Sequence, residues 1–472
     1  MIYNLFMVFF TFAISCILFK KASGTLKPNK LNLISYIFYL FILQSFIGSS
    51  LIYLGFREHY LIQKVTNFST IGKTYDMICF TAIALPLTIL LIYKIFNINM
   101  SEDYNNYLNK EVILEYEDNI FVITVLISIV CLIFTLILFI KMRSIPLIDL
   151  IIHRSSGNIG NKRINISHGN YMNQYIQNLL VLGLTPILSY LSYIYYKCTK
   201  TNRWKILFFV LFIASIFLKT YNYAKTPVVF YIFVFILINI VIEGSIPIRK
   251  LLTVLVLCVF IILLMYIKIG YDFNKGLDIY NGPIGRTIFT QVGTLFLHVD
   301  LFPYYIPYLG GRSFSPTILK LFLGGVSQFR SGRVVMNFYS PEKVVGGTAG
   351  VMNSLFIGEA YANFGTIGVL SSVLYIGVLL SIILIIFVKI KKTPINIVIY
   401  VTITSILASA SQGGFIDFVY NFNIIFITVT LILISLFAKY MDKIKVLRYI
   451  KVYVLKFTSL NIKIKKEDKN EC

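Results

Sequence analysis

The sequence predicts an all-α, polytopic integral membrane protein. Of its 472 residues, 57% are hydrophobic and only 13% are charged, whereas a soluble chain carries about a quarter charged residues. Apolar runs of roughly 18 residues or more, the length that crosses a bilayer, recur along most of the chain. Because no soluble core needs that much uninterrupted apolar sequence, a membrane protein is the class that fits.

Eleven apolar runs are predicted to span the membrane, with twelve as the upper limit. They lie near residues 2–19, 32–54, 76–96, 120–140, 172–196, 205–220, 227–243, 251–269, 356–388, 395–412 and 416–438. No small-residue cleavage site follows the first run, so we expect a span there rather than a signal peptide. The run at 356–388 is longer than one span needs, which predicts that part of it lies outside the bilayer. Residues 1–438 are therefore expected to form a single transmembrane domain.

Basic residues set the expected orientation in the cytoplasmic (inner) membrane. The net charge is +23, and short loops rich in Lys and Arg alternate onto one face, which marks that face as cytoplasmic. The N-terminus is then outside and the C-terminus inside. The tail 439–472 holds ten Lys or Arg among apolar residues, so we expect it to lie against anionic lipid of the inner leaflet. Because the charges sit between spans, nucleic acid is not an expected partner.

Two long segments, 141–170 and 270–355, are predicted to lie outside. The first holds five basic residues against one acidic residue, and the second holds seven against four. This excess falls on the face where positive charge is disfavoured. The arginine fork binds phosphate oxygens bidentately and stays charged at any working pH. We therefore expect a cationic cavity for an anion at the membrane surface; the alternative is arginines that contact lipid headgroups.

The stretch GEAYANFGTIGVL, residues 358–370, begins the longest apolar run with a carboxylate and an amide. On a helix, Glu359, Asn363 and Thr366 form one polar stripe. A stripe of small residues, which permits close approach of another helix, runs beside it: Gly358, Ala362 and Gly365. An ionisable residue at membrane depth is a functional candidate. The alternative for Glu359 is an ion pair with a loop arginine at headgroup level.

The 25 residues GGTAGVMNSLFIGEAYANFGTIGVL join a Gly-rich outside loop to a GE-x-Y-x-N-F-G-x-x-G span. With eleven or twelve spans and two large arginine-rich outside loops, the chain resembles the oligosaccharide repeat-unit (O-antigen, Wzy-type) polymerases. The resemblance implies a metal-independent, membrane-embedded glycosyltransferase of the GT-C-like type. Such an enzyme moves a growing glycan from undecaprenyl pyrophosphate onto the next lipid-linked repeat unit, building O-antigen or capsular-type polysaccharide on the outer face of the membrane.

The resemblance also implies partners and site residues. The partners are the undecaprenyl-pyrophosphate-linked glycan donor and acceptor and membrane lipid, with room for a chain-length regulator protein. The family has important arginines in its outside loops, and they are matched here by the loop that holds them rather than by a tight motif. The matching residues are Arg143, Arg154, Arg163, Arg286, Arg312, Arg330 and Arg333.

The residues themselves predict chemistry without a nucleotide, a cofactor or a metal. There is no P-loop signature and no D-x-D pair of the kind that holds a nucleotide sugar through a metal. A sugar on pyrophosphate is already activated, and arginine and lysine can neutralise its leaving group. Glu359 is one candidate base for the acceptor hydroxyl, and His298, beside Asp300, is the other. Lys225, in a short outside turn, is a further candidate phosphate contact.

Three other functions remain open from the sequence. An O-antigen ligase uses the same donor with a different acceptor, and the sequence hardly separates it from a polymerase. A flippase or exporter of lipid-linked oligosaccharide would carry charges within its spans, whereas these spans are almost free of charge. A structural or sensory membrane protein would not need arginine-rich outside loops.

Overall fold

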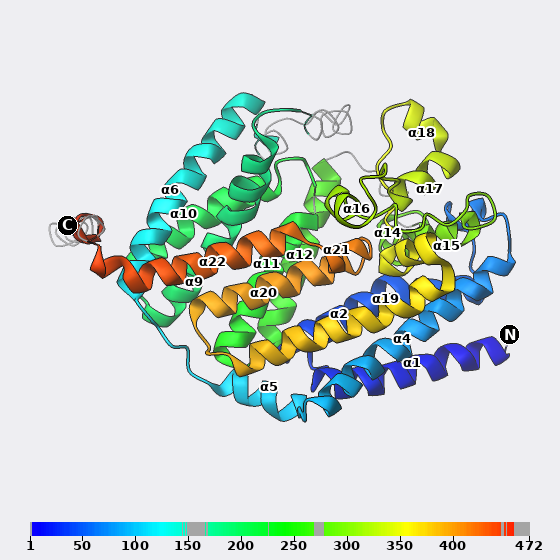
Figure 1. Cartoon of the computed structure of the whole chain (residues 1–472), viewed down its shortest axis with the longest axis horizontal. Coiled ribbons are helices and arrows are strands. Elements are labelled where there is room, and N and C mark those ends of the chain that lie inside the picture. The colour runs from blue at the N-terminus through cyan, green and yellow to red at the C-terminus, as the bar shows by residue number, and fades with distance from the viewer. Residues whose placement is uncertain are drawn as a thin grey trace. The chain divides into compact units, whose positions relative to one another are not determined.

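The computed structural model describes residues 2–143, 169–224, 226–268 and 278–444, together with 145, 146, 148, 166, 448, 449 and 451–456. Within these ranges every regular element is a helix, and no strand occurs (Figure 1). The expected all-α fold is therefore confirmed for this part of the chain. The length and apolar composition of many of the helices suit a protein that crosses a membrane several times.

Eight of the expected spans coincide with helices long and apolar enough to cross a membrane. These are Ile2–Lys30, Leu33–Tyr53, Ser69–Ile95, Glu117–Met142, Ile176–Thr199, Thr226–Glu243, Leu355–Lys389 and Ile416–Lys443. The other three expected spans are also helical but do not belong to this set: α10 (Asn202–Lys219), α12 (Ile248–Lys268) and α20 (Pro394–Ala410). The 18 residues of α10 include three basic side chains, and α20 has only 17 residues. The count of eleven stays a prediction.

The chain divides into two compact units. Unit 1 consists of Met1–Tyr107, Tyr271–Lys389 and Thr404–Asn421, and unit 2 consists of Leu108–Gly270, Ile390–Ile403 and Phe422–Cys472. Each unit joins segments that are far apart in the sequence. All the residues of the candidate site described below belong to unit 1.

Unit 1 is built on two long helices, α4 and α19, which pack along each other (Figure 1). Gly377 of α19 lies against α4 so closely that a Cβ atom there would come within 2.8 Å of the Thr88 side chain. A glycine at this position lets the two helices approach, as small residues do between membrane helices. The helices of unit 1 are α1 (Ile2–Ser23), α2 (Leu33–Phe41), the π-helix η2 (Ile42–Phe46), α3 (Ile47–Tyr53), α4 (Ser69–Ile95), α14 (Pro283–Ile288), α15 (Thr290–Leu301), α16 (Pro316–Phe322), α17 (Ser331–Tyr339), α18 (Pro341–Val345), α19 (Leu355–Lys389) and α21 (Ile416–Val419), with short 3-10 turns η1 (Pro28–Lys30) and η3 (Ile62–Lys64).

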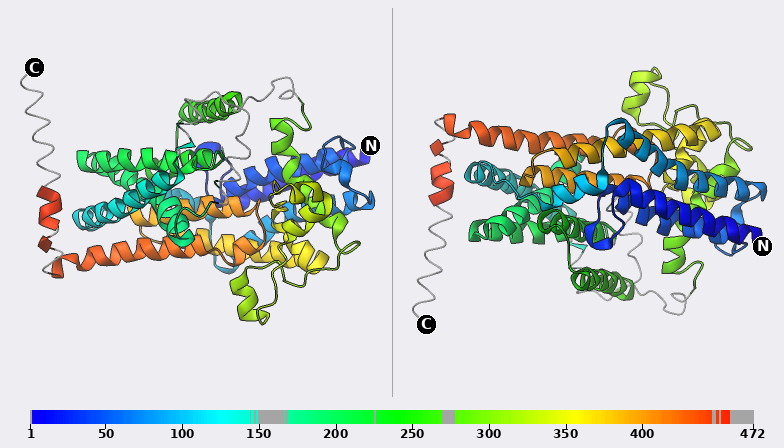
Figure 2. Two further views of the ribbon diagram at one scale, coloured as in Figure 1. Left: turned by 90° about the horizontal axis from the view of Figure 1, so that it is seen from above. Right: turned by 90° about the horizontal axis from the view of Figure 1, so that it is seen from below.

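Unit 2 contains a bundle in which α9 and α10 pack tightly and both contact α6 (Figure 2, cyan to green). The buried Trp204 stacks on Tyr195 with ring centroids 4.4 Å apart. Beside it, Arg203 pairs with Glu117 and Asp118, each at 2.6 Å. The helices of unit 2 are α6 (Glu117–Met142), the π-helix η5 (Ile176–Leu184), α9 (Thr185–Thr199), α10, α11 (Thr226–Glu243), α12 and α22 (Phe422–Tyr440), with the 3-10 turn η6 (Met441–Lys443), while α5 (Met100–Asn109) and α20 each cross a boundary between the units.

The described part of the second long loop contains five short helices, α14 to α18. Its run TIFTQVGTLFLHVDLFPYYIPYL contains α15, whose 12 residues reach only about 18 Å and cannot span. Every residue of α15 from Val292 to Leu301 is buried, and the helix packs against α4 and α19. Helix α15 is therefore part of the packed interior of unit 1.

Helix α19 is broken at Gly365, where φ is +62° and ψ is −147°. The prediction that Thr366 shares a polar stripe with Glu359 and Asn363 is therefore wrong. Glu359 and Asn363 are buried before the break, and Thr366 is exposed after it. The break separates a short arm, 355–364, from a long arm, 366–389. The long arm reaches about 36 Å, enough to span alone, so the short arm is free to build a polar site.

Replacing Gly365 with Ala should lower the free energy of unfolding by about 1–3 kcal/mol. This backbone conformation is essentially restricted to glycine, and a Cβ atom would come within 2.8 Å of the Tyr308 ring. Thermal unfolding of the detergent-solubilised protein measures the change. Gly72→Ala is the matched control, because Gly72 is helical in α4 with open space around it. Equal stability of the two variants would mean that the break does not depend on glycine.

Candidate functional site

The short arm of α19 is held by the loop that contains Gly310 and Gly311. Carbonyl groups in the last turn before a helix break need donors from elsewhere. Here Leu309 N–H donates to Ala362 O (2.9 Å) and Gly310 N–H donates to Asn363 O (3.1 Å). The two glycines have φ values of +59° and +88°, conformations that glycine adopts without strain. The sequence LGGRS thus folds around the end of the short arm.

The Asn363 side chain fixes the next turn of this loop. Its Oδ1 accepts hydrogen bonds from the N–H groups of Gly311 (3.0 Å) and Ser313 (3.4 Å). Its Nδ2 donates to Ser313 Oγ (2.7 Å) and to the Glu359 carbonyl one turn back (2.8 Å). Asn363 is only 1% exposed, so every one of these contacts is shielded from water. Asn363 therefore positions Ser313 beside Glu359.

Glu359 joins this loop to a second one. Its Oε1 accepts from Ser313 Oγ (2.7 Å) and its Oε2 accepts from Ile416 N–H (2.9 Å). The side chain is 4% exposed, and a buried carboxylate needs such donors. A Cβ atom on Gly414 would lie 2.3 Å from Oε2, so glycine is what allows the second loop to come this close.

These loops enclose a polar cavity of about 230 Å³. Two carboxylates, Glu359 and Asp417, and one guanidinium, Arg330, line it. The other lining residues are mostly small or uncharged: Ser313, Ser315, Gln328, Ser331, Gly332, Val351, Met352, Asn353, Ser354, Gly413, Gly414 and Ile416. Hydroxyl, amide and charged groups therefore converge on one volume, the arrangement expected of a ligand site.

The structure brings some of the predicted arginines near this cavity and leaves others elsewhere. Arg330 lines the cavity. Arg312 is exposed on the loop next to Ser313, with its guanidinium 6.0 Å from the Phe329 ring centre. Arg333 donates to the carbonyls of Ala349 (3.4 Å) and Gly350 (3.3 Å), in the segment that leads to the cavity.

Two further described candidates, Arg286 and Arg143, do not line the cavity. Arg286 is exposed in α14, and Arg143 is exposed at the end of α6 in unit 2. Arg154, Arg163 and Lys225 lie outside the described residues. The first long loop, 141–170, and the tail beyond Lys456 also fall largely outside them, so their expected roles stay predictions.

Asp300 and His298 form a separate, fully buried centre on α15 that does not line the cavity. Asp300 accepts four hydrogen bonds: from Thr66 N–H and Oγ1, both at 2.9 Å, from Asn67 N–H at 2.9 Å, and from Tyr339 O–H at 2.6 Å. It therefore ties α15 to the loop before α4 and to α17. This is the geometry of a structural carboxylate.

His298 is two residues before Asp300 on α15, so the two side chains point to different sides of the helix. Its Nδ1 donates to the Thr294 carbonyl (2.7 Å), and its Nε2 has no hydrogen-bond partner among the described residues. Burial lowers the pKa of His298 to about 4. The imidazole is therefore neutral at pH 7, and its position inside α15 keeps it from the cavity that holds Glu359.

Asp417 and the double glycine before it are the main cavity residues that the sequence reasoning missed. They lie in SQGGFIDF, residues 411–418, where the two glycines separate the runs expected at 395–412 and 416–438 and Asp417 is at the start of the second run. A carboxylate that follows two glycines between apolar helices is the same signal that Glu359 gives at the start of α19. Ser313, Gln328 and Asn353 carried no comparable signal, because they are ordinary polar residues of a long loop.

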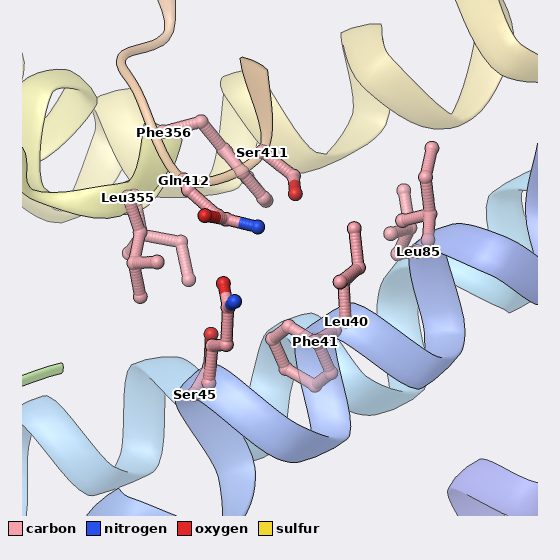
Figure 3. A pocket seen from close by; sticks show the side chains of 11 residues that line it. Leu40, Phe41, Ser45, Leu85, Leu355, Phe356, Ser411 and Gln412 are labelled. Carbon is pink, nitrogen blue, oxygen red and sulfur yellow. The ribbon is translucent and has the colours of Figure 1, made fainter. Parts of the chain in front are cut away.

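A second, much smaller pocket lies beside this site and is lined by the chain neighbours of cavity residues, Leu355 and Gln412. Figure 3 shows Gln412 and Ser411 pointing towards Ser45 and Phe41 on the facing helices. Its volume of about 10 Å³ is too small for a sugar, because a single water needs about as much. This pocket is part of the packing between α2, η2 and α19.

No protein-family model, curated protein or solved structure matches this chain. Within the described residues, no three His, Cys, Asp or Glu side chains lie together as a metal site would require. The function must therefore be argued from the cavity and its residues.

Replacing Asp300 with Asn should destabilise unit 1 by about 3 kcal/mol, because hydrogen bonds to a charged group are strong and the amide replaces one of the two acceptor oxygens by a donor. Thermal unfolding in detergent measures the loss. Glu58→Gln, on an exposed side chain of the same unit, is the control and should change stability little. A variant as stable as the control would show that the four hydrogen bonds contribute no net stability.

His298 should make the protein less stable in mild acid. The unfolded chain takes up a proton near pH 6.5, whereas the folded His298 has a pKa of about 4. Stability is therefore fully present above pH 6.5 and falls by up to about 3 kcal/mol as the pH drops to 4. His298→Gln, which cannot titrate, should show a smaller loss over this interval in denaturant unfolding. The same slope in both proteins would contradict the assignment.

Proposed function

We propose that the protein is a membrane-embedded glycosyltransferase that polymerises lipid-linked oligosaccharide repeat units. The observation that carries this proposal is that a guanidinium, Arg330, and two carboxylates, Glu359 and Asp417, line the same polar cavity. A glycosyl donor on pyrophosphate needs a cation for its leaving group, and a sugar acceptor needs a base for its hydroxyl. The cavity offers both types of group.

The electrostatics of Arg330 suit a diphosphate. No ion pair within 4 Å involves Arg330 in the part of the chain that the structure describes, although both carboxylates line the same cavity. Its fork is therefore available for phosphate oxygens. Arg312, on the loop next to Ser313, and Arg333, in the first turn of α17, would extend the cationic surface along the glycan or the diphosphate.

The resemblance of residues 346–370 to repeat-unit polymerases supports the same proposal. Within that stretch, Asn353, Ser354 and Glu359 line the cavity, and Gly365 and Asn363 shape it. We propose accordingly that the donor is carried by undecaprenyl pyrophosphate, that the cavity opens to the outer face of the cytoplasmic membrane, and that transfer needs no metal.

Reconstitution tests the proposal directly. The purified full-length protein in lipid vesicles would receive synthetic undecaprenyl-pyrophosphate-linked repeat units, and the products would be sized by gel electrophoresis. A ladder of polymers supports the polymerase. Transfer to a lipid-A-type acceptor without a ladder would indicate a ligase, and movement of the lipid-linked unit across the bilayer without any glycosidic bond would indicate a flippase; either result overturns the proposal.

Arg330→Ala should reduce polymer formation at least about 100-fold, because an oriented cation on a leaving group contributes about 3 kcal/mol. Arg330→Lys should recover only part of the rate, because a point charge does not reproduce the fork. Arg249→Ala, on an exposed arginine of unit 2, is the control and should polymerise normally. Full activity of Arg330→Ala would remove Arg330 from the donor site.

A further inference from the structure

Asp417 belongs to two cavities. It lies in α21, and besides the cavity of Glu359 and Arg330 it lines a second cavity of about 270 Å³. Gly414 N–H donates to Asp417 Oδ2 at 3.3 Å, a long contact that leaves the carboxylate only loosely tied. Asp417 is half-buried rather than enclosed, so a ligand in either cavity can reach it.

The two cavities differ in charge. The second is lined by Ser405, Ile406, Ser409, Ala410, Asp417 and Asn421. It therefore offers two hydroxyls, an amide and two apolar side chains, and none of the described residues that line it is basic. Such a lining suits the hydroxyls and the apolar face of a neutral sugar, whereas a diphosphate would find no cation there.

The two carboxylates also differ in their freedom to accept a proton from a substrate. Both oxygens of Glu359 already accept short hydrogen bonds, from Ser313 and Ile416, and the side chain is 4% exposed. The contacts of Glu359 join two loops, which is a positioning role. Asp417 lines both cavities, and its Oδ2 accepts one long hydrogen bond, from Gly414 N–H.

We propose that the second cavity binds the acceptor sugar and that Asp417, rather than Glu359, is the base that takes the proton of the acceptor hydroxyl. This inference rests on the proposed function. In the transfer step the acceptor oxygen bonds to the anomeric carbon of the donor glycan while the bond from that carbon to the diphosphate oxygen breaks. The hydroxyl proton moves to Asp417, and the electron pair of the broken bond leaves with the diphosphate beside Arg330.

The first test replaces Asp417 with Asn in the full-length protein and follows transfer in vesicles with synthetic undecaprenyl-pyrophosphate-linked repeat units. The kcat should fall about 100-fold or more, the usual effect of removing a general base. Binding of the donor, measured with the same lipid-linked unit alone, should stay within about twofold. Asp103→Asn, on a carboxylate of unit 1 that lines neither cavity, should behave as the wild type.

The second test separates the two cavities. Ser409→Ala should raise the KM for the acceptor about tenfold, the effect of one lost hydrogen bond to a sugar, while leaving the KM for the donor unchanged. Arg330→Ala should weaken donor binding instead. This split would not follow from a general loss of packing, which would change both constants together.

Each result decides the proposal. An Asp417→Asn variant that keeps its kcat, or that loses donor binding, overturns the assignment of Asp417 as the base. An unchanged acceptor KM in Ser409→Ala overturns the acceptor cavity. Failure of the wild-type protein to form any glycosidic bond would instead overturn the proposed function itself, so the two kinds of failure are distinguishable.

Discussion

The candidate site depends on the break in α19 at Gly365 and on the loop that the break allows to dock. A continuous helix would bond its own carbonyl groups, so the chain could not offer Ala362 O and Asn363 O to the backbone of Leu309 and Gly310. The break also gives the two arms of α19 different roles. The long arm supplies apolar length, and the short arm supplies polar side chains held by buried hydrogen bonds.

The cost of placing charge in such an apolar protein explains the form of the site. A buried carboxylate is strongly unfavourable unless donors compensate it, and Glu359 has a hydroxyl and a backbone N–H at short distances. These donors come from segments far from it in the sequence. The hydrogen bonds that compensate the burial of the Glu359 carboxylate therefore also hold together the two loops that line the cavity. A change that loosens one of these loops should affect the other.

The sequence predicted the helical class, the polar start of the longest apolar run and the pairing of Glu359 with Asn363 on one face. These features follow from local rules, namely apolar length and helical spacing. It did not predict that Gly365 breaks the helix, because a glycine at a packing position and a glycine at a break look alike in one sequence. It also missed Asp417, whose importance depends on a tertiary contact between its loop and the short arm. His298 was a candidate base because it lies beside Asp300 in the sequence, yet the two side chains have separate hydrogen-bond partners.

On the proposed reaction, the difference in charge between the two cavities has a chemical reason. The reacting end of the donor is the sugar attached to diphosphate. Negative charge develops on the diphosphate oxygen as its bond to the sugar breaks, and a guanidinium stabilises that charge. The reacting end of the acceptor is a neutral hydroxyl, far along the glycan from its own diphosphate. A cation beside that hydroxyl would oppose the build-up of positive charge as its oxygen forms a bond. Among the described residues, one cavity is lined by Arg330 and the other by no basic side chain. Asp417 lines both, so the pair of cavities suits both ends of the reaction.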